Sequence, residues 1–157
     1  MKMPTASLFL LSLLGLSIVL PLSAQHEHDH EQHHHAAGAL AALELDHGER
    51  WATDEPLRQG MSRIRDAFDR RHGAFHDGEM SDRDYQGLAD ELGQAIDHIF
   101  AHCSLPPAAD AELHKLLAAM LGARQQLADA DAEGMIALHR ALVAYPEYFE
   151  HAGWIEN

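Results

Sequence analysis

Apolar residues recur every three or four positions along four successive stretches of this chain, which is the spacing of amphipathic helices. In the first stretch they are Leu57, Met61, Ile64 and Phe68. These intervals place the apolar side chains on one helix face, which must be buried against a neighbouring element. No stretch shows the alternation of apolar and polar residues that a half-buried strand requires. We therefore expect an all-α fold.

Residues typical of helix ends bound the first two expected helices. The first begins behind Asp54 with Pro56 in its first turn, and Gly73 is expected to end it, with residues 75–80 as a loop. The second begins at Ser81, a capping residue with an acid, Asp84, at the third helical position. Both boundaries follow from local chemistry alone.

The last two expected helices are set by prolines and by an acidic turn. Pro106 and Pro107 end the second helix and begin the third, and the fourth begins near residues 129–131. Pro146 is expected to kink or end the fourth helix. Links this short make successive helices antiparallel. The expected fold is an antiparallel up-down-up-down four-helix bundle over residues 51–157.

The first 24 residues have the pattern of a secretory signal peptide. Lys2 precedes an apolar run from Leu8 to Leu20, and a small-residue cleavage site ends at Ala24. The run is shorter than the roughly 20 residues of a membrane-spanning helix. We expect cleavage after Ala24, export to the periplasm and no membrane association afterwards.

Residues 25–50 are expected to be a disordered, histidine-rich tail and linker. The tail has no apolar residue between its histidines, so it cannot bury a core of its own. Neutral imidazoles on a flexible chain bind Cu(II) or Zn with modest selectivity. Six of the 14 histidines belong to this tail: His26, His28, His30, His33, His34 and His35.

The charge balance excludes two classes of partner. The chain has 25 Asp and Glu against 11 Lys and Arg, and a formal net charge of −14 at pH 7. Loss of Lys2 with the signal peptide makes the remaining protein more negative still. A surface of this charge repels phosphate backbones and anionic lipids, so we expect neither nucleic acid nor membrane as a partner.

The expected topology gathers sulfur and imidazole groups at one pole of the bundle. His98 and His102 are spaced i, i+4, an arrangement by which one helix chelates a metal. Thiolate and thioether ligands favour Cu(I), and imidazole accepts copper or zinc. Each residue also has a structural interpretation, such as a core position for Met61. The candidate ligands are Met61, His98, His102, Cys103, His114 and His151.

Cys103 is the single cysteine of the chain, so no disulfide can form within it. The residue continues the apolar stripe of the second helix, which leaves three interpretations open. The thiol is buried and inert, pairs with another chain, or ligates a metal.

Three segments have a distinctive sequence: LDHGERWATDEPLRQGM at 45–61, HCSLPPAADAELH at 102–114 and YFEHAGW at 148–154. They resemble a family of small exported proteobacterial proteins labelled DnrO-like, and the resemblance covers most of the chain behind the signal peptide. It implies a periplasmic helical bundle. It also gives weight to Met61, Cys103, His114 and His151, because these positions carry the motif, but it does not name a ligand.

The preferred hypothesis is a non-enzymatic, periplasmic copper-binding protein that acts as a buffer or carrier. The tail would collect Cu(II) or Zn, and the soft site in the bundle would hold Cu(I). A protein partner for metal transfer and a homodimer both stay open.

Two other classes compete with this hypothesis. The first is a b-type haem-binding electron carrier with Met61 and His151 as axial ligands, since the Cys-x-x-Cys-His motif of covalent haem attachment is missing from the sequence. The second is a structural or partner-binding bundle whose histidines are incidental. An enzyme is not expected, because no third group that would orient a Cys103–histidine pair is recognisable.

Overall fold

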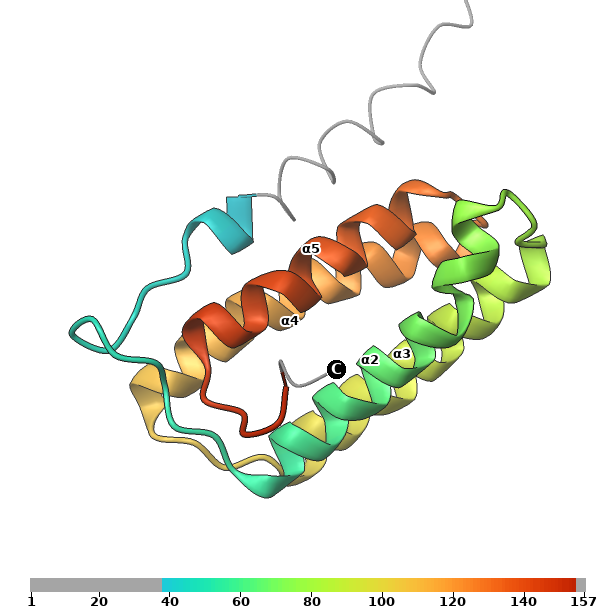
Figure 1. The fold of residues 1–157 in the computed structure, drawn as a ribbon. Helices are drawn as coiled ribbons and strands as arrows, with labels where there is room; N and C mark the ends of the chain where they lie inside the picture. The colour runs from blue at the N-terminus through green and yellow to red at the C-terminus, as the bar shows by residue number, and fades with distance from the viewer. Residues whose placement is uncertain (1–37, 155–157) are drawn as a thin grey trace, which may run out of the picture.

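The computed structural model describes residues 38–154, so the predicted signal peptide and the tail histidines 26–35 lie outside the described residues. The described chain is helical and has isolated bridges but no β-strand, which confirms the all-α prediction. After one helical turn at 38–41 come four long helices, each running back along the one before it (Figure 1). They are α2 (Glu55–His76), α3 (Asp82–His102), α4 (Pro107–Ala128) and α5 (Glu133–Tyr148).

The start of α2 is as predicted, but its end is not. The Asp54 carboxylate caps the helix and accepts a hydrogen bond from the Leu57 amide at 2.9 Å. The predicted end near Gly73 is wrong, because Gly73 stays helical and its carbonyl accepts a hydrogen bond from the Asp77 amide. The extra turn carries His76, which the sequence analysis places in a loop.

The boundaries of α3 and the start of α4 are also as predicted. Ser81 caps α3, and its side chain and that of Asp84 form a reciprocal capping box. Cys103 follows the last residue of α3 in an extended conformation, and Pro107 is the first residue of α4. The adjacent prolines therefore separate these two helices as expected.

Helix α5 begins later than predicted and ends two residues after Pro146. It begins at Glu133 rather than near 129–131, because Ala130 turns the chain with a φ of 58°. Pro146 lies inside α5 without ending it, and the helix continues to Tyr148. The Phe149 amide closes the last turn on the carbonyl of Tyr145.

The helices are not equally well packed against one another. Contacts are extensive between α2 and α3, α3 and α4, and α4 and α5, but sparse between α2 and α5. We call this last contact the α2–α5 seam. Helix α3 approaches α2 closely at Gly60, where a Cβ would lie 2.3 Å from Cγ1 of Ile99. Of the described helices, none combines the length and the apolar character needed to cross a bilayer.

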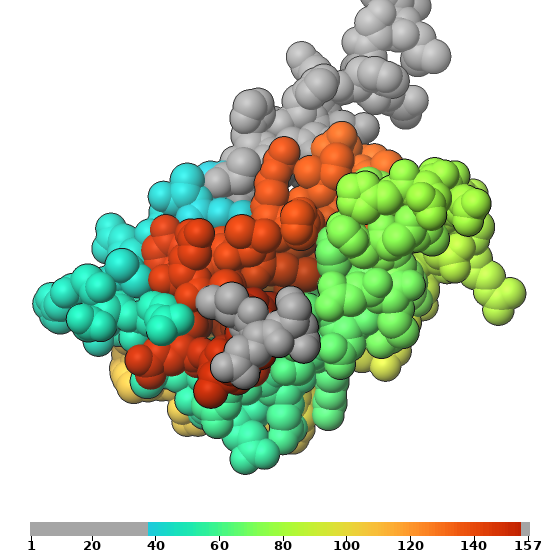
Figure 2. Space-filling model, viewed as in Figure 1, coloured from blue at the N-terminus to red at the C-terminus, as the bar shows by residue number. Residues whose placement is uncertain are grey.

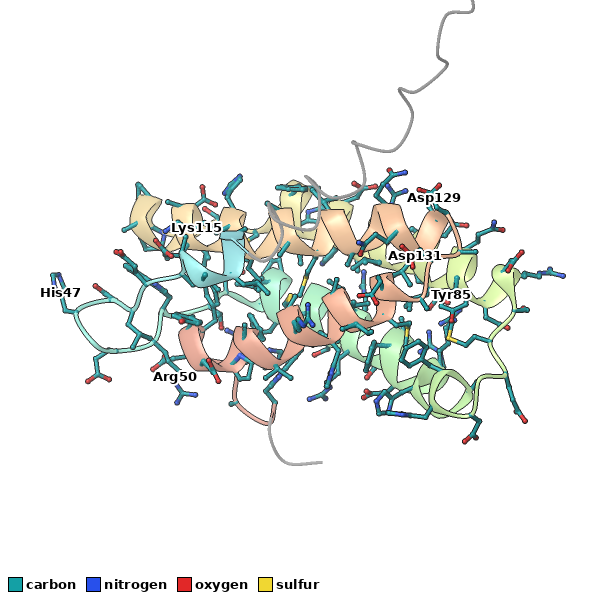
Figure 3. The ribbon with its side chains drawn as sticks, turned by 90° about the horizontal axis from the view of Figure 1, so that it is seen from above. His47, Arg50, Tyr85, Lys115, Asp129 and Asp131 are labelled. Carbon is teal, nitrogen blue, oxygen red and sulfur yellow. The ribbon has the colours of Figure 1, made fainter. Side chains whose placement is uncertain are left out.

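Part of the predicted linker is fastened to the helices. The Trp51 amide donates to the carbonyl of Tyr148 at 2.7 Å, and the Glu150 amide donates to the carbonyl of Trp51 at 2.8 Å. Further towards the N-terminus, the Glu44 amide donates to the Glu112 carboxylate at 2.9 Å. The segment then projects outwards in a tight turn at 46–49, whose tip carries His47 (Figure 3). Residues 42–51 thus have a defined path over the ends of α4 and α5.

Candidate metal centre

The sulfur atoms of Met61 and Cys103 lie in surroundings that suit a structural role better than metal ligation. Met61 is 0% exposed and belongs to the apolar core. The Cys103 thiol donates a hydrogen bond to the carboxylate of Asp54. Burial, and next the negative charge of Asp54, raise the pKa of the thiol to about 12. Because a metal binds the thiolate, this environment works against ligation by Cys103.

Asp54 connects the beginning of α2 to the end of α3. Besides capping α2, its carboxylate accepts a hydrogen bond from the Ser104 amide at 2.7 Å and one from the Cys103 thiol. Burial alone would raise the pKa of Asp54. The hydrogen bonds from Ser104, Leu57 and Cys103, together with the charge of Arg58, outweigh burial and lower it. The group is therefore a charged structural link.

His151 occupies an aromatic corner behind α5. Its Nδ1 atom lies 3.2 Å from the Tyr145 hydroxyl, and its ring packs against Tyr145 and Trp154, with centroids 5.7 and 5.0 Å away. Burial first, and then the charges of Arg58 and Arg65, lower the pKa of His151. A neutral ring hydrogen-bonded to the Tyr145 hydroxyl explains this position without a metal.

The other three predicted histidines lie on helix surfaces. His114 is exposed, with Nδ1 2.8 Å from the carbonyl oxygen of Asp110 in its own helix and its ring 5.9 Å from that of Phe100. His98 and His102 are neighbours with ring centroids 4.8 Å apart. The Nε2 atom of His98 is buried and has no hydrogen-bond partner among the described residues. Burial, and next the charge of Arg63, lower the pKa of His98.

The structure thus brings His98 and His102 together but gives Cys103, His114 and His151 separate hydrogen-bond partners. Cys103 is hydrogen-bonded to Asp54, His151 to Tyr145 and His114 to its own helix. Within residues 38–154, no three His, Cys, Asp or Glu side chains are arranged to hold one metal ion.

A second group of histidines, which the sequence analysis does not single out, lies on α2 and α5. The Nε2 atoms of His72 and His76 are 3.1 Å apart, and the ring centroids are 4.5 Å apart. The ring of His139, from α5, has its centroid 6.0 Å from that of His72 and stacks on Phe68 at an interplanar angle of 6°. The i, i+4 spacing of His72 and His76 is visible in the sequence, but the predicted helix end at Gly73 hides it.

This group borders a groove of about 520 Å³ along the α2–α5 seam. Figure 2 shows α2 and α5 side by side on this face of the molecule. Phe68, Leu142 and Trp154 supply apolar lining, and His72 and His139 supply imidazole. His72 is therefore reached through the groove and His76 is exposed, whereas Met61 is buried in the core.

The spacing of the two Nε2 atoms suits chelation of a single ion. Zinc–imidazole bonds are about 2.0–2.1 Å long, so two nitrogens 3.1 Å apart subtend about 100° at a shared ion. This angle falls between those of square-planar and tetrahedral coordination. Imidazole ligands suit copper, zinc and nickel.

Comparison of the chain with protein families, curated proteins and solved structures gives no match.

Proposed function

We propose that this protein is an exported, non-enzymatic metal-binding protein that buffers or carries copper in the periplasm, with zinc as a competing ion. The observation that carries the proposal is the 3.1 Å approach of Nε2 of His72 to Nε2 of His76. In the metal-free pair one nitrogen donates a hydrogen bond to the other, with the roles set by the ring tautomers, and a metal ion can replace the proton of that hydrogen bond. The site needs no rearrangement of α2.

The proposal gives the helices and the tail different roles. The helices form an antiparallel four-helix bundle, which holds two ligands at a fixed distance, and ligands on a rigid element bind more selectively than ligands on a flexible chain. The six histidines of the tail collect metal ions and raise their concentration near the bundle. Loss of the His72–His76 pair should therefore reduce the selectivity of the protein among metal ions more than the number of ions that it binds.

The geometry favours imidazole ligation, and hence Cu(II), over the soft Cu(I) site expected from the sequence. Met61 is enclosed by apolar side chains, and Cys103 keeps its proton beside Asp54. The haem alternative needs free axial groups at Met61 and His151, but His151 is engaged by Tyr145. No described contact supports haem.

The test uses the chain without its signal peptide and with the six tail histidines replaced by Asn, which we call the tail-silent protein. It is titrated calorimetrically with Cu(II) and, separately, with Zn(II). We expect one Cu(II) site that is lost in the His72→Ala/His76→Ala double variant. The matched control is His47→Ala/His114→Ala, which also removes two histidines but no chelating pair, and it should keep the site.

Two results would contradict the proposal. Undiminished Cu(II) binding in the His72→Ala/His76→Ala variant would show that the pair is not the site. Absence of any binding in the tail-silent protein would leave the helices with a structural role, and the histidines of the bundle would be incidental.

A further inference from the structure

We propose that His139 supplies a third ligand, so that an ion bound by His72 and His76 also ties α5 to α2 across the α2–α5 seam. This inference rests on the proposed function, because it needs the pair as the first two ligands. It adds a structural consequence that the pair alone does not have. Binding would join two helices that are otherwise in sparse contact.

Two of the ring separations, His72–His76 and His72–His139, are compatible with one shared ion. With a metal–nitrogen bond of about 2.05 Å, the centre of a ligating imidazole lies about 3.2 Å from the ion, so two such centres are at most about 6.4 Å apart. The centroids of His72 and His76 are 4.5 Å apart, and those of His72 and His139 are 6.0 Å apart. Both separations are below the limit.

As the side chains lie, no three His, Cys, Asp or Glu groups of residues 38–154 are arranged to hold one ion, so the side chain of His139 has to turn before the third bond forms. The ring of His139 lies flat on Phe68, with centroids 5.5 Å apart. His139 is exposed, and exposed side chains exchange rotamers within nanoseconds. His139 lines the same groove as His72, so its side chain lies near the pair before it rotates.

Asp69 is the competing third ligand. It also lines the groove and lies one turn before His72 on α2. Ligation by Asp69 would keep the ion on α2 alone and would leave the seam unbridged. The two arrangements therefore differ in the identity of the third ligand atom and in whether the metal stabilises the contact between helices.

The experiment compares His139→Ala, His139→Phe and Asp69→Asn in the tail-silent protein, with His114→Ala as the control. We expect both His139 variants to bind Zn(II) at least tenfold more weakly and to lose most of the rise in Tm caused by the metal. His139→Phe retains an aromatic ring on Phe68, so its loss of affinity reports ligation rather than packing. Asp69→Asn and His114→Ala should bind like the parent protein.

Nitrogen hyperfine structure in the electron paramagnetic resonance spectrum of bound Cu(II) gives a second readout. It should indicate three imidazole nitrogens in the parent and two in His139→Ala. Unchanged affinity and spectrum in His139→Ala, with binding abolished in His72→Ala/His76→Ala, would overturn the inference and leave the proposed function intact. A loss confined to Asp69→Asn would overturn it in favour of a carboxylate ligand. Failure of the parent to bind metal would refute the proposed function itself.

Discussion

The thiol of Cys103 donates a hydrogen bond to the carboxylate of Asp54, and this contact joins the residue after α3 to the residue before α2. Each group favours one ionisation state of the other: the carboxylate of Asp54 and the protonated thiol of Cys103. The thiol stabilises the charge of Asp54, and that charge opposes formation of a thiolate. The single cysteine of the chain is therefore kept unreactive by a neighbour 49 positions earlier in the sequence.

We expect Cys103 to resist alkylation in the native protein. Its pKa is raised from 9.0 to about 12, so the thiolate fraction near pH 8 falls by about 10³ relative to the unfolded chain. Iodoacetamide labelling followed by mass spectrometry, with and without urea, measures the ratio of rates. Asp54→Asn removes the negative charge and should accelerate labelling of the folded protein. Equal rates in folded and unfolded protein would contradict the assignment.

Asp54→Ala should cost more stability than loss of a simple helix cap. The substitution removes the cap of α2, worth about 1 kcal/mol, and also the hydrogen bonds from the Ser104 amide and the Cys103 thiol. We expect a decrease of about 2 kcal/mol in the free energy of unfolding, measured in urea. Ser81→Ala is the control, because Ser81 caps only its own helix, and it should cost about 1 kcal/mol. Equal costs would show that Asp54 does not link the two helices.

Acid should weaken the same link. The pKa of Asp54 is lower in the folded protein than its ordinary value of 3.8. The stabilisation from its charge is therefore complete above pH 3.8 and is lost as pH falls through the lower, folded pKa. Urea unfolding at pH 5 and at pH 3 should show a smaller difference between the wild type and Asp54→Asn at the lower pH. A difference that grows on acidification would give the pKa shift the opposite sign.

The helix starts could be predicted because a cap acts on the few residues that follow it. Asp54 and Ser81 bond to amides three positions ahead, and both sites are confirmed. The end of α2 could not be predicted, since a glycine ends a helix only where the chain turns left-handed. Gly78 makes that turn, with a φ of 68°, and Gly73 does not.

The group formed by His72, His76 and His139 combines one contact that is local in the sequence with one that is remote. The pairing of His72 with His76 is local and becomes readable once α2 is known to reach His76. The approach of His139 is set by how α5 lies beside α2, which no spacing within one helix reveals. In the same way, the sequence predicts that Cys103 and His114 lie at one pole, but it does not show that Cys103 hydrogen-bonds to Asp54 and that His114 bonds the carbonyl of Asp110 in its own helix.

Two glycines of α2 should respond in opposite directions to alanine. A Cβ at Gly60 would lie 2.3 Å from Cγ1 and 2.7 Å from Cδ1 of Ile99, a buried, β-branched residue that cannot move aside freely. Overpacking of this kind costs about 1–3 kcal/mol, so Gly60→Ala should lower Tm. Around Gly73, no described atom outside its own helix and its chain neighbours comes within 4 Å of the position that a Cβ would take.

Gly73→Ala should therefore stabilise the protein by about 0.5–1 kcal/mol, because alanine loses less conformational freedom in a helix than glycine does. The substitution also stiffens the turn between His72 and His76, so Cu(II) affinity of the tail-silent protein should not fall. Thermal unfolding and calorimetric titration of Gly73→Ala measure the two effects. A lower Tm would mean that α2 ends before His76 in solution, and the histidine pair would then lose the helical backbone that fixes its spacing.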